Sequence, residues 1–484
     1  MEVRFGTFKI STSVPGCGDY LSNIGEMFYL ALPALRNIAA TAKGIQLNRL
    51  RYGEHYLKTV DDILDRKGWS LDQFTAYQTA RLRKIIAIAV CHIPYYRDLF
   101  ASLGLSPQDV STANDLRKLP ILEKSLVRSD PWQFVDERIK KGHLLKETTT
   151  GTTGTPTTVL LTNRVQQEHY AFYEARCRRE AGLRYGQDSY VMFGARRVAA
   201  VQQSDPPFWC YNYAGKQLYM SVFHLAPQDL RYYCDELSRR SYRALMGYPS
   251  AISTVAQYVI AQGIRSIKIP LAITSGETLQ QHQRTAIENA FGCRVFDQYG
   301  CAELSVFAAE GQCGQRHVSL DYGIVEIVDD AGDPVPLGDV GHLVCTGLIN
   351  DAQVLLRYRT GDMGAWGINS CKCGSALPVL ASIAGRSTDA LLLRDGRKVF
   401  RVGTIAERIA CIKEYQIIQD DIELYTINVV VSAPLHDFET KELIENLQAH
   451  VGRVSVRVKC VAALERSEGG KISFIKCKVP REIR

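Results

Sequence analysis

The sequence predicts an α/β protein with a large N-terminal α/β domain of several subdomains, which includes a β-rich portion, and a small α+β lobe at the C-terminal end. Three observations predict this. Short apolar runs alternate with segments of helical periodicity between residues 163 and 290, a pattern typical of parallel sheets covered by helices. Strand and turn residues dominate residues 318–366, and the pattern changes again after residue 385. A chain of 484 residues is also too long for one ordinary core.

The first elements are expected to be helical. Residues 24–40 are apolar but interrupted by charges and a proline, so they predict an amphipathic helix that packs on the body rather than a membrane span. Residues 71–128 show helical spacing with breaks at Pro94 and Pro120. A loop rich in threonine and glycine follows, and residues 163–181 predict a long helix.

The alternating region supplies the predicted parallel sheet. Residues 190–193 and 271–274 are short apolar runs that end in Gly or Ser, whereas residues 229–239 and 280–290 have helical periodicity. In a sheet of this kind, ligands bind where strands end in loops.

The last third of the chain divides into hairpins and a small lobe. Residues 325–328 and 342–346 predict strands around a turn at residues 329–334. Beyond them, the order of elements suits a ferredoxin-like lobe: a helix at residues 402–412, a strand pair at 415–431, a helix at 438–451 and a strand at 454–464. We therefore predict three regions, an N-terminal extension of unassigned role at residues 1–70, a core domain at 71–385 and a mobile lobe at 386–484.

Composition narrows the class of protein. Hydrophobic residues make up 46% and charged residues 23% of the chain, values typical of a folded soluble protein. The net charge of +7 is modest and spread along the sequence, which disfavours nucleic acid as a partner but suits an anionic small molecule. No signal peptide is recognisable, and the 14 cysteines are scattered without the regular spacing of a disulfide-rich domain. We therefore expect a cytoplasmic location.

The loop at residues 147–157 has the composition of a phosphate-binding loop. Glycines allow a close approach of the backbone, and threonine hydroxyls and backbone N–H groups donate to phosphate oxygens. No Gly-Lys-Ser/Thr closes it, so it is not a Walker A loop. An ordinary surface turn is the alternative. The candidate phosphate ligands are Thr149, Thr150, Gly151, Thr152, Thr153, Gly154 and Thr155.

Four further clusters follow in a definite order. They are Thr274-Ser-Gly-Glu-Thr-Leu279, Asp297-Gln-Tyr-Gly-Cys-Ala-Glu303, Leu356-Arg-Tyr-Arg-Thr-Gly-Asp362 and Gly469-Gly-Lys-Ile472. Each alone could be a turn, a buried tyrosine or a surface ion pair, but all five in this order by accident are improbable.

Together, the five clusters resemble the adenylate-forming superfamily of acyl-CoA synthetases, adenylation domains and luciferases. Within it, the chain is most similar to the phenylacetate–CoA ligase branch, which includes relatives associated with capsule-polysaccharide genes. The motifs specific to this branch are Ile93-Pro-Tyr-Tyr-Arg97, Leu119-Pro-Ile-Leu-Glu-Lys124 and Met246-Gly-Tyr-Pro-Ser250. The resemblance spans residues 71–478 and does not include the first seventy residues.

The resemblance implies roles in nucleotide binding for most of the clustered residues. The loop from Thr149 to Thr155 would hold the β- and γ-phosphates of ATP, and Glu303 would ligate Mg²⁺, which favours carboxylate oxygen. Tyr299 would lie on the adenine face, and Asp362 would accept hydrogen bonds from the ribose hydroxyls. The remaining implied nucleotide-binding residues are Ser275, Gly276 and Glu277 along the adenine edge, Asp297 at the adenine amino group, Gln298 and Gly300 beside Tyr299, and Arg386 near the ribose.

Lys471 resembles the mobile lysine of the family's C-terminal lobe. That lysine bridges the attacking carboxylate and the α-phosphate and neutralises the charge that develops there. The implied chemistry has two steps, formation of an acyl-AMP and then capture of the acyl group by a thiol or an amine, with rotation of the lobe between them. Two positions depart from the family pattern: Thr155 replaces a common lysine, and Thr388 replaces the usual hinge Asp or Lys.

Two pairs of residues outside these clusters suggest zinc. Cys371 and Cys373 form Cys-x-Cys-Gly, while Cys313 and His317 form Cys-x₃-His. Together they offer the four soft or borderline ligands of a closed tetrahedral site. The alternative is a set of free cysteines, because the sequence cannot show whether the two pairs meet.

Three readings of function follow. The first is a ligase that converts an aryl or similar carboxylic acid to a CoA thioester, with ATP, Mg²⁺ and coenzyme A as cofactors. The second passes the acyl group to an amine, such as an amino sugar, and the third is a non-catalytic scaffold. We expect the acid pocket near Phe193-Gly-Ala-Arg196, Tyr248 and the segment before Tyr299, and a homodimer is compatible with the resemblance.

Overall fold

The computed structural model describes residues 33–148, 157–200, 202–386, 391–395, 398–399, 405–406, 409, 411–467 and 470–479. The α-helices are α2 (Pro33–Arg51), α3 (Glu54–Asp65), α4 (Leu71–His92), α5 (Pro94–Leu103), α6 (Lys124–Ser129), α7 (Asn163–Phe172), α8 (Arg179–Ala181), α9 (Leu230–Ser238), α10 (Pro249–Ala261), α11 (Gln281–Phe291) and α12 (Asp437–Val451). The strands are β1 (Leu145–Thr148), β2 (Thr158–Leu161), β3 (Tyr190–Phe193), β4 (Trp209–Asn212), β5 (Gln217–Met220), β6 (Ala244–Gly247), β7 (Leu271–Ser275), β8 (Arg294–Gly300), β9 (Phe307–Glu310), β10 (Arg316–Val318), β11 (Gly323–Val328), β12 (Gly341–Gly347), β13 (Tyr358–Trp366), β14 (Leu380–Arg386), β15 (Leu391–Leu392), β16 (Lys398–Val399), β17 (Ile412–Asp421), β18 (Leu424–Val431), β19 (Ser455–Cys460) and β20 (Ile475–Cys477).

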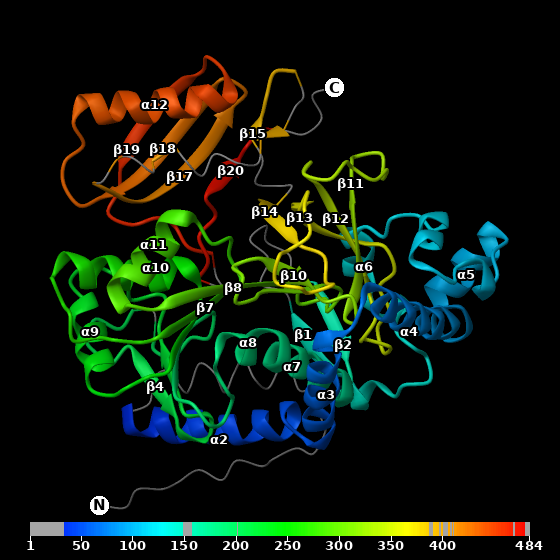
Figure 1. Ribbon diagram of the computed structural model, residues 1–484. Coiled ribbons are helices and arrows are strands. Elements are labelled where there is room, and N and C mark those ends of the chain that lie inside the picture. Colours follow the sequence, from blue (N-terminus) through cyan, green and yellow to red (C-terminus); the bar gives the residue numbers. More distant parts are fainter. Residues whose placement is uncertain are drawn as a thin grey trace, which may run out of the picture.

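An eight-stranded sheet of order β10-β9-β8-β7-β6-β3-β5-β4 forms the centre of the core (Figure 1). Strands β8, β7, β6, β3 and β5 are parallel, and the edge strands are antiparallel. This confirms the predicted α/β class. The predicted helix at residues 163–181 is also present, although residues 173–178 form a π-helical turn between α7 and α8.

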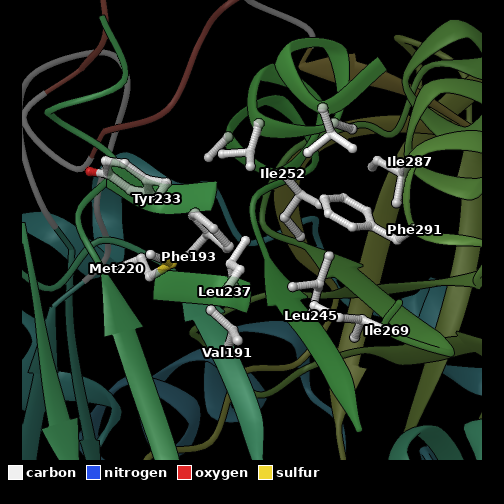
Figure 2. Close-up of a cluster of buried hydrophobic side chains, with 14 of the residues drawn as sticks. Val191, Phe193, Met220, Tyr233, Leu237, Leu245, Ile252, Ile269, Ile287 and Phe291 are labelled. Atoms are coloured by element: carbon white, nitrogen blue, oxygen red, sulfur yellow. The ribbon is translucent and has the colours of Figure 1, made fainter. Parts of the chain in front are cut away.

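The sheet is buried on both faces because its strands carry apolar side chains on both. Val191 and Phe193 of β3 face α9, α10 and α11, and Figure 2 shows them packed with Leu237 and Ile252. Tyr190 lies on the other face, in a cluster with α3 and α7. Each fully buried aliphatic or aromatic side chain contributes about 1.5–3 kcal/mol, so these two layers hold the strand ends that carry the site.

Helices α4 and α5 begin at local signals in the sequence. Ser70 and Gln73 form a capping box at the start of α4, and Pro94 occupies the first turn of α5. Helix α2 extends to Arg51, beyond the predicted end at residue 40, and packs on the core through Ala40. At least residues 33–65 therefore cover the core.

The C-terminal lobe has its own hydrophobic core. Its apolar cluster runs from Leu391 to Ile475 and contains none of the residues of the central sheet. The boundary near residue 385 stays a prediction. Strands are ordered β19-β18-β17-β20 with α12 on one face. The expected α+β character holds, but β18 and β19 are direct parallel neighbours, whereas a split βαβ unit has a strand between them. Most of the helix expected at residues 402–412 lies outside the described residues.

In Figure 1 the lobe (orange and red) lies at one end of the core, and α2 (dark blue) lies at the opposite end. Between them, β11 to β14 form a separate four-stranded antiparallel sheet, in agreement with the predicted β-rich portion. Within the described part of the chain, every helix is too short or too polar to cross a membrane.

Candidate functional site

Two predicted segments meet at the carboxyl ends of β7 and β8. The strands are parallel and in register, with Ser275 opposite Gln298. Immediately after β7, Gly276 has a φ of +83°, and a Cβ there would lie 2.8 Å from the ring of Tyr248. A side chain would therefore clash as well as strain the backbone, so this turn needs glycine.

The loop that carries Lys471 reaches the same turn from the lobe. Its Nζ lies 5.6 Å from the centroid of the Tyr248 ring, and its Cε lies 3.7 Å from where a Cβ on Gly276 would be. The structure thus brings the predicted mobile lysine to the predicted adenine-edge segment, although the two are almost 200 residues apart in sequence.

Glu277 ties the lobe to the core, which the sequence did not predict. One carboxylate oxygen accepts from the backbone N–H of Ile472 (2.9 Å) and the other from that of Ser250 (3.1 Å). Burial raises the pKa of this carboxyl, and the two N–H groups oppose the rise. Nearby, Arg466 of the lobe donates to the Ser250 hydroxyl at 3.2 Å. We call these contacts the Glu277 latch.

Tyr299 and Asp362 also meet. The Tyr299 hydroxyl donates to the Asp362 carboxylate at 2.9 Å, and burial together with that carboxylate raises the pKa of Tyr299 well above its usual value. Asp362 of β13 is the direct register partner of Arg386 at the end of β14. The two residues predicted to hold the ribose are therefore neighbours in one sheet.

Glu303 is buried, with 4% of its surface exposed. Its Oε1 pairs with Lys124 Nζ at 2.7 Å and accepts from the Tyr358 hydroxyl at 2.8 Å. The sequence did not assign Lys124 to the site, although it belongs to a branch motif. The signal available was chemical, because a buried carboxylate requires a cation or several donors.

The Asp297 carboxylate has partners within the protein. Thr274 donates to it at 2.7 Å, and Arg316 forms an ion pair with it. These contacts fasten β7, β8 and β10 to one another. Acceptance from an adenine amino group, the role implied for Asp297, stays a prediction.

The phosphate-binding prediction for Thr149 to Thr155 falls outside the described residues, as does Thr388 at the hinge. The strands that flank the loop, β1 and β2, pair antiparallel with Thr148 opposite Thr158.

The four predicted zinc ligands converge. The ligand atoms of Cys313, His317, Cys371 and Cys373 all lie within 4.8 Å of one another. His317 Nε2 lies 3.4 Å from Cys313 Sγ and 3.5 Å from Cys373 Sγ. Its Nδ1 lies 2.9 Å from the carbonyl oxygen of Leu377. That contact favours a proton on Nδ1 and leaves the Nε2 lone pair facing the sulfurs, as a metal-binding histidine requires.

A cavity of about 260 Å³ lies beside the nucleotide segments. Ser275 and Gln298 line it at the strand ends, and Met192 and Arg196 line it from β3 and the loop that follows. Of the residues expected around the acid pocket, Arg196 and Gln298 line this cavity, whereas Phe193 and Tyr248 do not; its use by an acid stays a prediction. The sequence missed helix α2, which contributes Gly44, Leu47, Asn48 and Arg51.

Comparison with known families identifies two matching regions. Residues 144–358 match a family described as AMP-binding enzyme, and residues 391–478 match one described as CapK C-terminal domain. Protein CapK of Staphylococcus aureus is 26% identical over 432 residues, which cover 85% of this chain and 89% of that protein. A phenylacetate-coenzyme A ligase of Pseudomonas putida is 26% identical over 431 residues, with coverage of 83% and 93%.

Solved structures share the fold. A 2-hydroxyisobutyryl-CoA ligase in its postadenylation state with 2-HIB-AMP superposes with a TM-score of 0.68 at 21% identity, covering 86% of this chain and 92% of that one. The same ligase in its thioesterification state, with 2-HIB-AMP and CoA, gives 0.54.

Proposed function

Since this chain is a member of the adenylate-forming superfamily, in the phenylacetate–CoA ligase-like branch, and is an acyl-adenylate-forming ligase, we propose that it activates a carboxylic acid with ATP and transfers the acyl group to coenzyme A. One observation carries the proposal. The Lys471 loop of the lobe meets the turn at Gly276, where β7 and β8 end.

In the first step, a carboxylate oxygen of the acid attacks the α-phosphorus of ATP, and pyrophosphate leaves with the electron pair of the broken P–O bond. Negative charge from both reactants gathers between them. The Lys471 ammonium would neutralise this charge, and such stabilisation is often the largest single contribution to catalysis. The Glu277 latch supports this role because it fixes the backbone of Ile472 next to Lys471.

Glu303 fits the proposed Mg²⁺ site. Lys124 and Tyr358 both contact Oε1, and among the described residues Oε2 has no hydrogen-bond or ion-pair partner. A hard carboxylate oxygen is thus left for the cation, which would neutralise phosphate charge when bound. Beside it, Tyr299 and Asp362 would recognise the adenine face and the ribose hydroxyls.

In the second step, the coenzyme A thiolate attacks the acyl carbonyl carbon and AMP leaves, forming the thioester. Transfer to an amine would follow the same course with nitrogen as the attacking atom. The two acceptors are distinguished by measuring AMP release with coenzyme A and with a panel of amines. Release that depends on an amine and not on coenzyme A would replace the thioester proposal with the amide one.

Acid-dependent exchange of pyrophosphate into ATP tests the first step directly. We expect exchange with at least one member of a broad panel of carboxylic acids, and only when Mg²⁺ is present. Absence of exchange across the whole panel would contradict the proposed function.

We also propose that Cys313, His317, Cys371 and Cys373 hold a structural zinc ion. The convergence of three thiols and one correctly oriented imidazole supports this, and four protein ligands leave no open position for catalysis. The ion would join the loop after β9 to the loop after β13, at the edge of the central sheet.

Replacing Cys371 and Cys373 together by serine is expected to remove the zinc and lower the melting temperature by several degrees, because a structural metal contributes folding energy. Metal content by mass spectrometry should fall from one zinc per chain to none. Cys460→Ser is the matched control, since this thiol is exposed on the lobe. Wild-type protein purified without chelators and free of zinc would contradict the proposal.

A further inference from the structure

We propose, resting on the proposed function, that the acid activated by this enzyme carries a second anionic group remote from the reacting carboxylate, and that Arg51 of α2 binds it. The cavity beside the strand ends has the chemistry for such an acid. It is unlike the flat apolar slot that a simple aryl acid requires.

The cavity is cationic. Arg51, Arg178 and Arg196 line it, and no aspartate or glutamate is among its lining residues. Six tyrosines contribute aromatic and hydroxyl groups to the remaining wall: Tyr52, Tyr170, Tyr173, Tyr185, Tyr190 and Tyr219. Charge of one sign inside a buried cavity attracts a ligand of the opposite sign.

None of the other titratable groups of the wall offsets this charge. Burial raises the pKa of Tyr170 and Tyr190 far above neutrality, so these phenols stay neutral. His169 also lines the cavity, and burial together with Arg51 and Arg178 lowers its pKa to about 4. The imidazole is therefore neutral too.

Two of the arginines differ in their partners. Arg178 lies 3.6 Å from the carboxylate of Glu174 and stacks on Tyr173 and Tyr185. Among the described residues, Arg51 stacks on Tyr170 alone, with its guanidinium carbon 4.6 Å from the ring centroid.

The Arg51 guanidinium lacks a close anion. Its Nε is buried without a hydrogen-bond partner, and no carboxylate of the described residues forms an ion pair with it. Glu147 acts on it through space. A buried N–H donor without a partner is costly, and a ligand carboxylate would accept from this Nε and a second guanidinium nitrogen in two parallel hydrogen bonds.

The positions of the lining residues set the orientation of the acid. Ser275 and Gln298 mark the end next to Gly276 and Lys471, where the reacting carboxylate must lie. Arg51 and Asn48 mark the wall formed by α2, which lies on the far side of the core from the lobe (Figure 1). The volume of about 260 Å³ exceeds the roughly 150 Å³ that holds one benzene molecule, so an extended acid fits.

The test compares acids of matched skeleton in pyrophosphate exchange, pimelate against heptanoate and 4-carboxyphenylacetate against phenylacetate. In the wild-type enzyme we expect kcat/KM for a diacid to exceed that of its monoacid by about 10- to 100-fold, the scale of a hydrogen-bonded charge pair. In Arg51→Met, this ratio should fall to near one. The ratio is internal to each protein sample and so does not depend on how much of the variant folds.

Arg49→Met is the matched control, because Arg49 is exposed on the same helix and does not line the cavity. It should keep the wild-type ratio. Equal use of diacids and monoacids by the wild-type enzyme, or an unchanged ratio in Arg51→Met, would overturn the inference and leave the proposed function intact.

Binding without ATP gives a readout independent of catalysis. Calorimetric titration should show pimelate or 4-carboxyphenylacetate binding to wild-type protein and to Arg49→Met, and binding at least about 10-fold weaker to Arg51→Met. If no acid supports exchange, the proposed function fails, while this titration still decides the inference. Failure of both diacids to bind wild-type protein would overturn it.

Discussion

Replacing Lys471 by alanine is expected to lower acid-dependent pyrophosphate exchange by at least about 10²–10³-fold, the cost of removing one electrostatic stabiliser from a reacting centre. The reason is positional. The lysine is brought to the Gly276 turn by the lobe, and neither Tyr248 nor any other group described at that turn offers a second ammonium. The fall should appear in kcat, because the charge develops only as the acyl–phosphate bond forms.

Two controls accompany this variant. Lys459→Ala removes an exposed lysine of the same lobe and should leave exchange unchanged. Transfer from a synthetic acyl-AMP to the acceptor should survive in Lys471→Ala, because that step forms no bond to the α-phosphorus and the phosphate only departs with AMP. Near-normal exchange in Lys471→Ala would show that the lysine is not the adenylation residue.

Glu303→Gln is expected to reduce exchange by about 100-fold or more and to raise the Mg²⁺ concentration needed for half-maximal rate. The amide keeps the shape of the side chain and can still accept from Tyr358, but it loses the anionic oxygen that a hard cation prefers. Changes even in the partners of metal ligands cost about 10- to 100-fold. The variant also leaves Lys124 without its carboxylate, so a lower melting temperature should accompany the kinetic change.

The control for this prediction is Glu123→Gln. Its side chain is 54% exposed and pairs with Arg359 at the surface, where an ion pair contributes little. It should retain wild-type exchange and Mg²⁺ dependence. An unaltered Mg²⁺ requirement in Glu303→Gln would exclude this residue from the metal site.

The parallel core could be predicted because its strands and helices leave distinct periodicities. The apolar runs of β3 and β7 predicted buried strands, and the helical periodicity of α9 and α11 predicted amphipathic helices. β4 and β5 were missed because each of these four-residue strands includes a polar residue, Asn212 or Gln217, and so lacks the continuous apolar run that marks β3. The π-helical turn at residues 173–178 was also missed, because it has no periodic signal in the sequence.

The candidate site, like the fold, could be predicted from the sequence only in part. Residue types in a fixed order were enough to predict a nucleotide site, and the assignment of individual side chains to it stays a prediction. Convergence was not predictable, because it depends on tertiary contacts such as the bridge between His317 and Val379, which joins the two halves of the cysteine–histidine cluster. The partner of Glu303 and the cavity wall from α2 were missed for the same reason. The amine acceptor and the homodimer stay predictions.

The Glu277 latch has a consequence for the speed of the proposed cycle. Two backbone N–H groups, one from each body of the enzyme, share this single carboxylate, so undocking must break a charge-assisted hydrogen bond inside a buried contact. The strength of that bond sets the dwell time of the closed form. A latch that is too weak would let the lobe undock before the acyl-AMP has formed. One that is too strong would delay entry of the thiol and make reopening of the lobe the slowest step of each turnover.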